Sequence, residues 1–280
     1  MSRSKSGGAD VAARPGIGGV ASIHTDLGHA LRQVPILQHC LILVVEGAKE
    51  LEGAAGSARV PAGAMVALPA GIAATLRNDA DPASGHYRAR VLAFDAGLIA
   101  AFPDTTHRPA VSGDPWQILR PSPALLEAFD HASRAVHSPH LSDALARHRF
   151  QEVLLGLAEQ GVVWSSRDSD TLTQRLRLLM AGRPDAPWAA ADAAKAANVS
   201  EPTLRRRLAA EGTSFRELLA EVRLSHGLML LQTSRAGIAE IALACGYESP
   251  SRFASRFRER FGTPPSGIRT APAAEVSETG

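Results

Sequence analysis

Two stretches near the C-terminus repeat the same arrangement of apolar and polar positions. Each begins with a short helix of small apolar residues, over 190–198 and over 238–246. These helices stop at Asn198 and Gly246, residue types that tolerate the left-handed backbone of a sharp turn. A second helical pattern starts directly after each turn. The repeat predicts two helix-turn-helix units.

The second helix of each unit combines an apolar stripe with a basic outer face. Ser200 and Ser249 are placed to cap these helices, because a hydroxyl takes up free backbone N–H groups. Apolar residues recur every four positions, as in a buried stripe: Leu204, Leu208, Phe253, Phe257 and Phe261. The arginines outside the stripes are Arg205, Arg206, Arg207, Arg252, Arg256, Arg258 and Arg260. Guanidinium groups bond to guanine edges and phosphates, so two equivalent clusters favour DNA binding over a merely solvated helix face.

A third helix is predicted between the units, over residues 215–231. At 1.5 Å per residue, a helix of about 17 residues is roughly 25 Å long. With its neighbours it can hold two recognition helices about one DNA turn, roughly 34 Å, apart. Gly227 interrupts the pattern and is expected to make the helix more flexible, at a cost of about 1 kcal/mol relative to Ala. One monomer is therefore predicted to reach two successive major grooves.

Residues 171–269 closely resemble the DNA-binding domain of the AraC/XylS transcription regulators, over roughly a third of the chain. The resemblance is carried by the segments 200–208, 211–215, 222–224, 238–242, 246–247 and 261–265, with Phe253 and Phe257.

The resemblance implies which residues meet DNA. Base contacts fall on outward positions early in the two recognition helices: Pro202, Arg205, Arg206, Ser251, Arg252 and Ser255. Phosphate contacts fall on Thr203 and Arg256. Pro202 is an exception among these positions. Its side chain has no hydrogen-bond donor, so it offers a base only an apolar contact.

Charge separates the two halves of the chain. Residues 171–272 hold 15 Arg or Lys against 9 Asp or Glu, whereas residues 1–170 hold 15 against 17. A basic surplus confined to one half favours an anionic partner there, and the near-neutral half needs another role. A membrane surface is the competing anionic partner, but no basic amphipathic helix stands apart from the repeat.

The N-terminal half is typical of a small antiparallel barrel or sandwich. Short apolar runs over 41–45, 65–68 and 91–94 are separated by Gly, Pro, Asn and Asp. Residues 60–71 resemble a turn-strand-turn of the cupin-like sensor barrels that often precede AraC-type domains. His24, His29, His39 and His86 are scattered rather than clustered, so we expect ordinary histidines and no metal site.

Two further helices are predicted at about 123–136 and 141–163, each with one apolar stripe. Two interpretations of the stripes stay open. In the family, helices at this place join sensor barrels into dimers; alternatively, both helices pack on their own barrel.

These patterns together predict an α+β fold. We expect a disordered tail over 1–18 and a cupin-like sensor or dimerisation β-barrel with accessory helices over 19–164. A linker over 165–170 then leads to an all-α AraC-type DNA-binding domain over 171–272, and a tail covers 273–280.

Signals for catalysis are weak. The segment 137–140 places two histidines close together without a third ligand, and the glycines of 16–19 lack the strand-to-helix setting of a phosphate loop. We therefore expect no enzyme activity, no catalytic residues, no metal and no cofactor. Two cysteines, Cys40 and Cys245, suit a reducing compartment, and no apolar run spans a bilayer, so a cytoplasmic location is expected.

The sequence thus predicts a sequence-specific transcription regulator, activator or repressor, controlled by an effector at the N-terminal barrel. The expected partners are double-stranded DNA, RNA polymerase, a small-molecule effector whose binding residues the sequence does not identify, and a second copy of the chain; a membrane is not expected. Two alternatives remain. One is a regulator without a ligand, controlled by abundance or a protein partner, and the other is a cupin enzyme fused to a DNA-binding domain.

Overall fold

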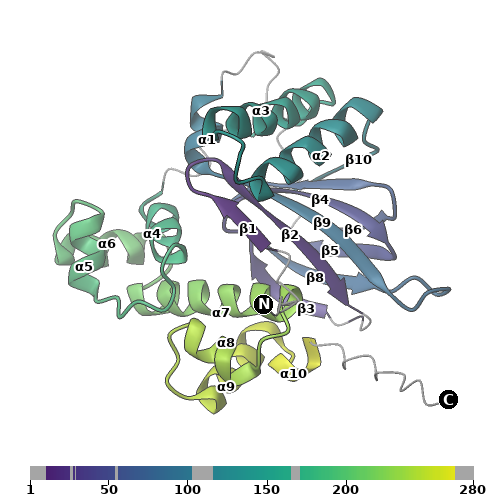
Figure 1. Cartoon of the computed structure of the whole chain (residues 1–280). Coiled ribbons are helices and arrows are strands. Elements are labelled where there is room, and N and C mark those ends of the chain that lie inside the picture. Colours follow the sequence, from purple (N-terminus) through teal and green to yellow (C-terminus); the bar gives the residue numbers. More distant parts are fainter. Residues whose placement is uncertain are drawn as a thin grey trace, which may run out of the picture.

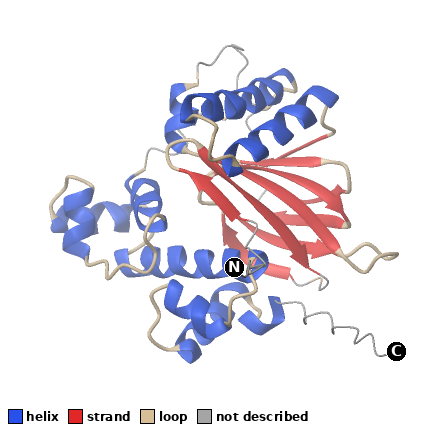
Figure 2. Ribbon diagram, viewed as in Figure 1, coloured by secondary structure: helices blue, strands red, loops and turns tan. Residues whose placement is uncertain are grey.

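The computed structural model describes residues 11–25, 28, 30–53, 56–102, 116–164 and 171–268. Strands dominate the first half of the chain and helices the second (Figures 1 and 2). This division confirms the predicted α+β class.

Two antiparallel sheets form the N-terminal part. One has the strand order β1 (Val11–Arg14), β2 (Gly18–Thr25), β9 (Tyr87–Phe94), β4 (His39–Glu46), β7 (Met65–Leu68) and β10 (Gln117–Leu119). The other has the order β3 (Ala30–Pro35), β8 (Ala73–Asp79), β5 (Ala48–Gly53) and β6 (Gly56–Pro61). The apolar runs predicted as strands lie in β4, β7 and β9.

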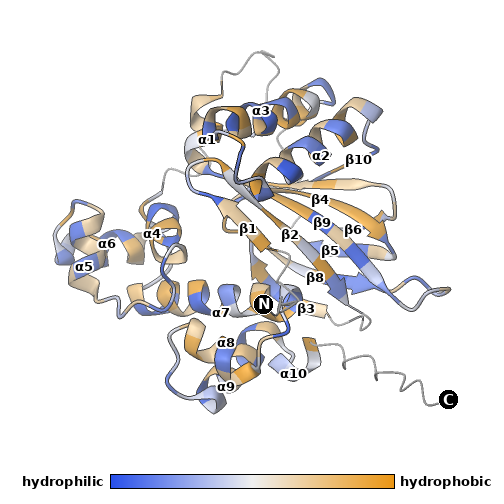
Figure 3. Cartoon of the chain, viewed as in Figure 1, coloured by the Kyte–Doolittle hydropathy of each residue, from blue (hydrophilic) through white to orange (hydrophobic). Residues whose placement is uncertain are grey.

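Strand β4 explains why the sequence shows a continuous apolar run there. Its even positions, such as Ile42 and Val44, are buried with residues of the four-stranded sheet. Its odd positions, Leu41 and Leu43, are buried against helices on the opposite face. A strand covered on both faces needs apolar side chains on both of them, and in β4 the apolar run covers residues 40–45, between His39 and Glu46 (Figure 3).

The predicted β-barrel requires a correction, because the two sheets do not close into one barrel. In the described ranges each strand pairs only within its own sheet, and the two sheets meet through side chains. Apolar runs identify buried strands, but closure depends on backbone pairing at the sheet edges, which leaves no side-chain pattern. The cupin-like likeness is compatible with this open arrangement.

Helices cover the outer face of the six-stranded sheet (Figure 1). These are α1 (Ala96–Ala101), α2 (Pro123–His137) and α3 (Asp143–Glu159). Phe129 and Phe150 are fully buried against the sheet, whereas Leu126 of α2 and Leu145 of α3 are exposed. The stripes therefore pack mainly on their own domain, and self-association stays a prediction.

The predicted disordered tail over 1–18 is wrong for residues 11–18. Strand β1 pairs with β2 in this segment, with Val11 opposite Ala21. Its four residues are too short to give a periodic signal. Residues 1–10, the predicted linker 165–170 and the predicted tail 273–280 lie outside the described residues, and the domain bounds stay a prediction.

The C-terminal part consists of helices arranged in two groups. The first contains α4 (Leu172–Ala181), α5 (Ala190–Ala196) and α6 (Glu201–Ala210). The second contains α8 (Ile238–Ala244), α9 (Pro250–Phe261) and α10 (Pro265–Ile268), and α7 (Phe215–Thr233) runs between them (Figure 1). Among the helices described, none is both long and apolar enough to cross a membrane.

Strand β3 completes the core of the second group. Leu31 and Val34 are buried together with Phe253, Phe257 and other side chains of α7, α8 and α9. The two residues lie three apart, a spacing that places them on opposite faces of a regular strand. A register shift between them, with Gln33 at a φ of 50°, brings both side chains to the helices. The N-terminal part is thus packed directly on the second helix-turn-helix unit.

Gly227 serves close packing, which corrects the expectation of a flexible helix. A Cβ atom at this position would lie 2.8 Å from the Phe253 ring and 3.2 Å from the Cys245 sulfur. Gly227 is itself buried inside the continuous helix α7. Only a residue without a side chain lets α7 approach this ring so closely.

We expect Gly227→Ala to destabilise the protein although alanine favours helices. The propensity gain is about 1 kcal/mol, whereas overpacking costs about 1 to 3 kcal/mol. Urea unfolding should show a net loss of about 1 kcal/mol. In a Phe253→Leu background, which removes part of the ring, the same substitution should cost less. A gain in stability in the wild-type background would contradict this packing.

His39 is a buried core histidine, as the prediction of ordinary histidines allowed. Its Nδ1 accepts a hydrogen bond from the backbone N–H of Ala70 at 3.2 Å, and its ring lies 5.2 Å from that of Trp164. Burial lowers the pKa of His39 to about 4. The folded protein therefore keeps this ring neutral where the unfolded chain binds a proton.

This histidine should make the fold sensitive to mild acid. Stability is unaffected above the unfolded pKa near 6.5 and falls as the pH drops toward 4. By pH 5 the expected loss is about 2 kcal/mol. His39→Gln keeps an acceptor for Ala70 but does not titrate, so its urea midpoint should change less between pH 7 and 5. The exposed His24→Gln serves as the control and should behave like the wild type.

Candidate nucleic-acid interface

The two helix-turn-helix units share their local geometry. Asn198 and Gly246 both adopt the left-handed backbone, with φ values of 55° and 73°, which confirms the predicted turns. The helix before each turn starts in the same way. The Asp192 carboxylate accepts the Ala189 N–H at 3.4 Å, and that of Glu240 accepts the Gly237 N–H at 3.3 Å. The units are therefore structural repeats.

The recognition helices α6 and α9 begin at capped serines, as predicted. The Ser200 hydroxyl accepts the backbone N–H of Thr203 at 3.3 Å, and the Ser249 hydroxyl accepts that of Arg252 at 3.3 Å. Pro202 and Pro250 occupy the first turns, where a missing N–H costs nothing. Both helix starts are fixed before any partner is bound.

Burial of the apolar stripes orients the basic faces outward. Leu204 and Leu208 are buried in the first unit, and Phe253, Phe257 and Phe261 in the second. Of the eight residues predicted to contact DNA, Thr203 is half-buried and the other seven are exposed: Pro202, Arg205, Arg206, Ser251, Arg252, Ser255 and Arg256. The structure places each group within the first two turns of its own recognition helix. Their contacts with DNA stay a prediction.

One of these arginines already has an anionic partner. Arg256 bonds to Glu259 at 3.0 Å, and both side chains are exposed. Exposed ion pairs contribute about 0 to 1 kcal/mol, so a phosphate group can replace the glutamate at small cost.

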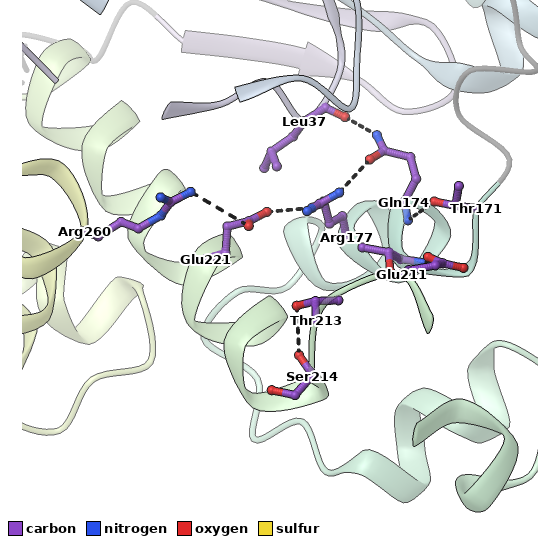
Figure 4. A network of polar contacts seen from close by, with 10 residues as sticks. Leu37, Thr171, Gln174, Arg177, Glu211, Thr213, Ser214, Glu221 and Arg260 are labelled. Carbon is purple, nitrogen blue, oxygen red and sulfur yellow. Dashed lines mark hydrogen bonds and ion pairs between the residues drawn. The ribbon is translucent and has the colours of Figure 1, made fainter. Parts of the chain in front are cut away.

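A network of polar contacts joins the helices behind the recognition surfaces (Figure 4). The Glu211 carboxylate, at the end of α6, accepts the backbone N–H of Thr173 in α4 at 2.9 Å. Burial raises the pKa of Glu211, but hydrogen bonds with Thr173 and its neighbours outweigh it and lower the pKa. The carboxylate is therefore held in its charged form at the junction of α4 and α6.

The network continues from α4 to α7 and to the N-terminal part. Arg177 donates from Nε to the Glu221 carboxylate of α7 at 2.6 Å, and Arg260 of α9 approaches the same carboxylate at 4.0 Å. Gln174 donates to the backbone carbonyl of Leu37 at 2.6 Å. The sequence does not predict these contacts, because partners 44 and 137 positions apart leave no local spacing signal.

Arg223 lies on another side of α7 and joins two loops. Its guanidinium donates to the carbonyls of Pro184 at 3.0 Å and of Ala186 at 2.9 Å in the first unit. It also lies against Gly246 of the second unit, where an added Cβ would come within 2.8 Å of it. Glycine at this turn therefore meets two demands, a left-handed backbone and the close approach of Arg223.

A separate cleft lies in the N-terminal part, between α2 and the outer face of β2 and β9. It has a volume of about 420 Å³, and its polar lining comes from Ser22, Arg90, Ser133, Arg134, His137 and Ser138. Arg90 is paired with Asp130 at 2.7 Å and lies over the Phe129 ring. Arg134 and His137 are exposed at the cleft. Across the described ranges, no three His, Cys, Asp or Glu side chains are grouped to hold a metal ion.

A family model described as a helix-turn-helix domain matches residues 193–271. This range contains both turns and both recognition helices.

Relatives of known function are transcriptional regulators. The urease operon transcriptional activator of Escherichia coli is 27% identical over 171 residues, which cover 60% of this chain and 57% of that protein. The regulator SirC of Salmonella typhimurium is 36% identical over 84 residues, 30% of this chain and 28% of its own length. The chain thus spans little more than half the length of the first relative and less of the second.

Solved structures of ToxT from Vibrio cholerae share the fold. An apo form of a single-residue variant has a TM-score of 0.63 and 16% identity, and covers 88% of this chain and 94% of that one. A wild-type form bound to unsaturated fatty acid has a TM-score of 0.59 and 17% identity, and covers 88% and 92%. The likeness therefore extends over the β-rich part as well as the helical part.

Proposed function

We propose that this chain is a transcription regulator of the AraC type that reads specific DNA sequences. The observation that carries the proposal is the pair of equivalent recognition helices, each with an exposed basic start. Arginines at such positions bond to guanine edges in the major groove. RNA polymerase is the further partner that we propose.

The placement of the side chains supports separate roles. We infer that Arg205, Arg206 and Arg252, which are exposed in the early turns, meet bases, and that Thr203 and Arg256 contact phosphates, as the family resemblance implies. The relatives named above are regulators rather than enzymes, which disfavours the alternative of a cupin enzyme fused to a DNA-binding domain.

Selection of duplexes from a random pool by the full chain should return two conserved blocks. Arg206→Ala should cost about 1 to 3 kcal/mol in affinity and relax the sequence of one block, and Arg252→Ala that of the other. Arg256→Ala should weaken all duplexes alike, because a phosphate contact carries no sequence information. Sequencing of the selected pools and titration of single duplexes measure both effects.

Arg120→Ala is the control. Arg120 is an exposed residue of the N-terminal part, far in sequence from both recognition helices. Its loss removes the same charge, and the variant should bind DNA like the wild type. Failure of the wild-type chain to enrich any sequence over random competitor at moderate salt would refute the proposed function.

We further propose that the N-terminal part binds a small anionic effector in the cleft beside α2. Arg90 and Arg134 supply positive charge, three serines supply hydroxyls, and Val20 supplies an apolar contact. This combination suits a carboxylate attached to an apolar body. ToxT, a protein of the same fold, has been solved with an unsaturated fatty acid bound.

Thermal-shift measurements with fatty acids and aromatic carboxylates test the effector. A carboxylate at about 100 times its Kd should raise the Tm by roughly 5 °C. Arg134→Ala should abolish the shift and Arg120→Ala should not. If no carboxylate acts on the wild type, the alternative of a regulator controlled by abundance or a protein partner gains support.

A further inference from the structure

The two helix-turn-helix units are held together through α7. The first half of α7 contributes Leu218 and Val222 to the core of the first unit. The second half contributes Leu224, Leu228 and Leu231 to the core of the second. α7 packs against α4 on one side and against α8, α9 and α10 on the other. Rotation or bending of α7 therefore changes the distance and angle between the recognition helices.

Glu221 lies at the point where α7 passes from one core to the other. Its carboxylate receives Arg177 from α4 at 2.6 Å on one oxygen and faces Arg260 from α9 at 4.0 Å on the other. The Glu221 and Arg177 side chains are each 19% exposed, so water screens their pair only in part. A single carboxylate thus binds a helix of the first unit and the recognition helix of the second (Figure 4).

The contact reaches the other recognition helix through α4. Glu211, which follows α6, holds the start of α4 by its bond to the Thr173 N–H. Arg177 lies one turn further along α4. Polar contacts at two points of α4, bridged by the helix itself, therefore connect the end of α6 with Glu221 and the last turn of α9.

We propose that Glu221 is a positioning residue that sets the separation between the two DNA blocks that the chain prefers. The inference rests on the proposed DNA-reading function. DNA blocks one base pair nearer or farther differ in both distance and rotation, so they fit only if the recognition helices move relative to each other. The two ion pairs of Glu221 oppose this movement and thereby penalise other separations. Gln174, beside Arg177 in the network, also bonds to Leu37, so the N-terminal part is linked to the same set of contacts.

The test compares full-length wild type with Glu221→Gln, which keeps the shape of the side chain but removes the charge. Duplexes selected from a random pool are scored for the number of base pairs between the blocks. The wild type should prefer one separation. For Glu221→Gln, the affinity ratio between the best duplex and the same duplex with one added base pair should fall severalfold, while the sequence of each block stays unchanged.

Glu217→Gln is the matched control. Glu217 is an exposed carboxylate one turn earlier on α7, so its loss changes the net charge equally and should leave the ratio intact. Arg260→Gln breaks only the contact to α9 and should lower the ratio to a smaller extent; it decides the test if Glu221→Gln does not fold.

Three results would overturn the inference. An unchanged ratio in Glu221→Gln would show that the carboxylate does not set the separation. Equal weakening on every separation would assign it a general structural role. Absence of any selected block with the wild type would remove the DNA-reading function itself, a failure that the wild type alone reveals.

Discussion

Burial of α7 in two different cores is the constraint on which the arrangement of the DNA-binding part depends. Val222 belongs to the first core and Leu224 to the second. Side chains two positions apart on an α-helix point in directions that differ by roughly 200°, because each residue turns the helix by about 100°. The two cores therefore lie on opposite sides of α7. The apolar sequence of one helix thus fixes how two repeated units are rotated relative to each other. Polar residues between the cores, such as Glu221, then meet both units.

The two halves of the chain differ clearly in sequence, but in the structure they are in direct contact. Charge and apolar patterning separate a β-rich half from a basic helical half. In the structure, Leu31 and Val34 of β3 are part of the second helix-turn-helix core, and Gln174 bonds to Leu37. The first unit, by contrast, draws its buried cluster from helices α4 to α7. A change in the N-terminal part can therefore reach the second unit through the shared core and the first unit through the Gln174 hydrogen bond.

Burial inside the N-terminal part changes the pKa of a polar side chain there. Lys49 is 2% exposed; its ammonium bonds to Asn78 and lies 5.3 Å from the centre of the Tyr87 ring. Burial lowers the pKa of Lys49 to about 8. The arginines of the cleft beside α2 remain partly exposed. The charge available to an anion therefore lies outside the sandwich, on the side covered by helices.

Local patterns in the sequence were enough to determine the repeat, its turns at Asn198 and Gly246, its caps and the exposed arginines. Each of these depends on neighbours within one or two helical turns, whose spacing is visible in the chain. Tertiary structure alone decided the open pair of sheets, the role of Gly227 and the contacts of Glu221. These depend on atoms brought together from distant positions, such as Phe253 against Gly227 and Arg177 against Glu221. Side-chain type at either position is compatible with many partners, and only packing selects one.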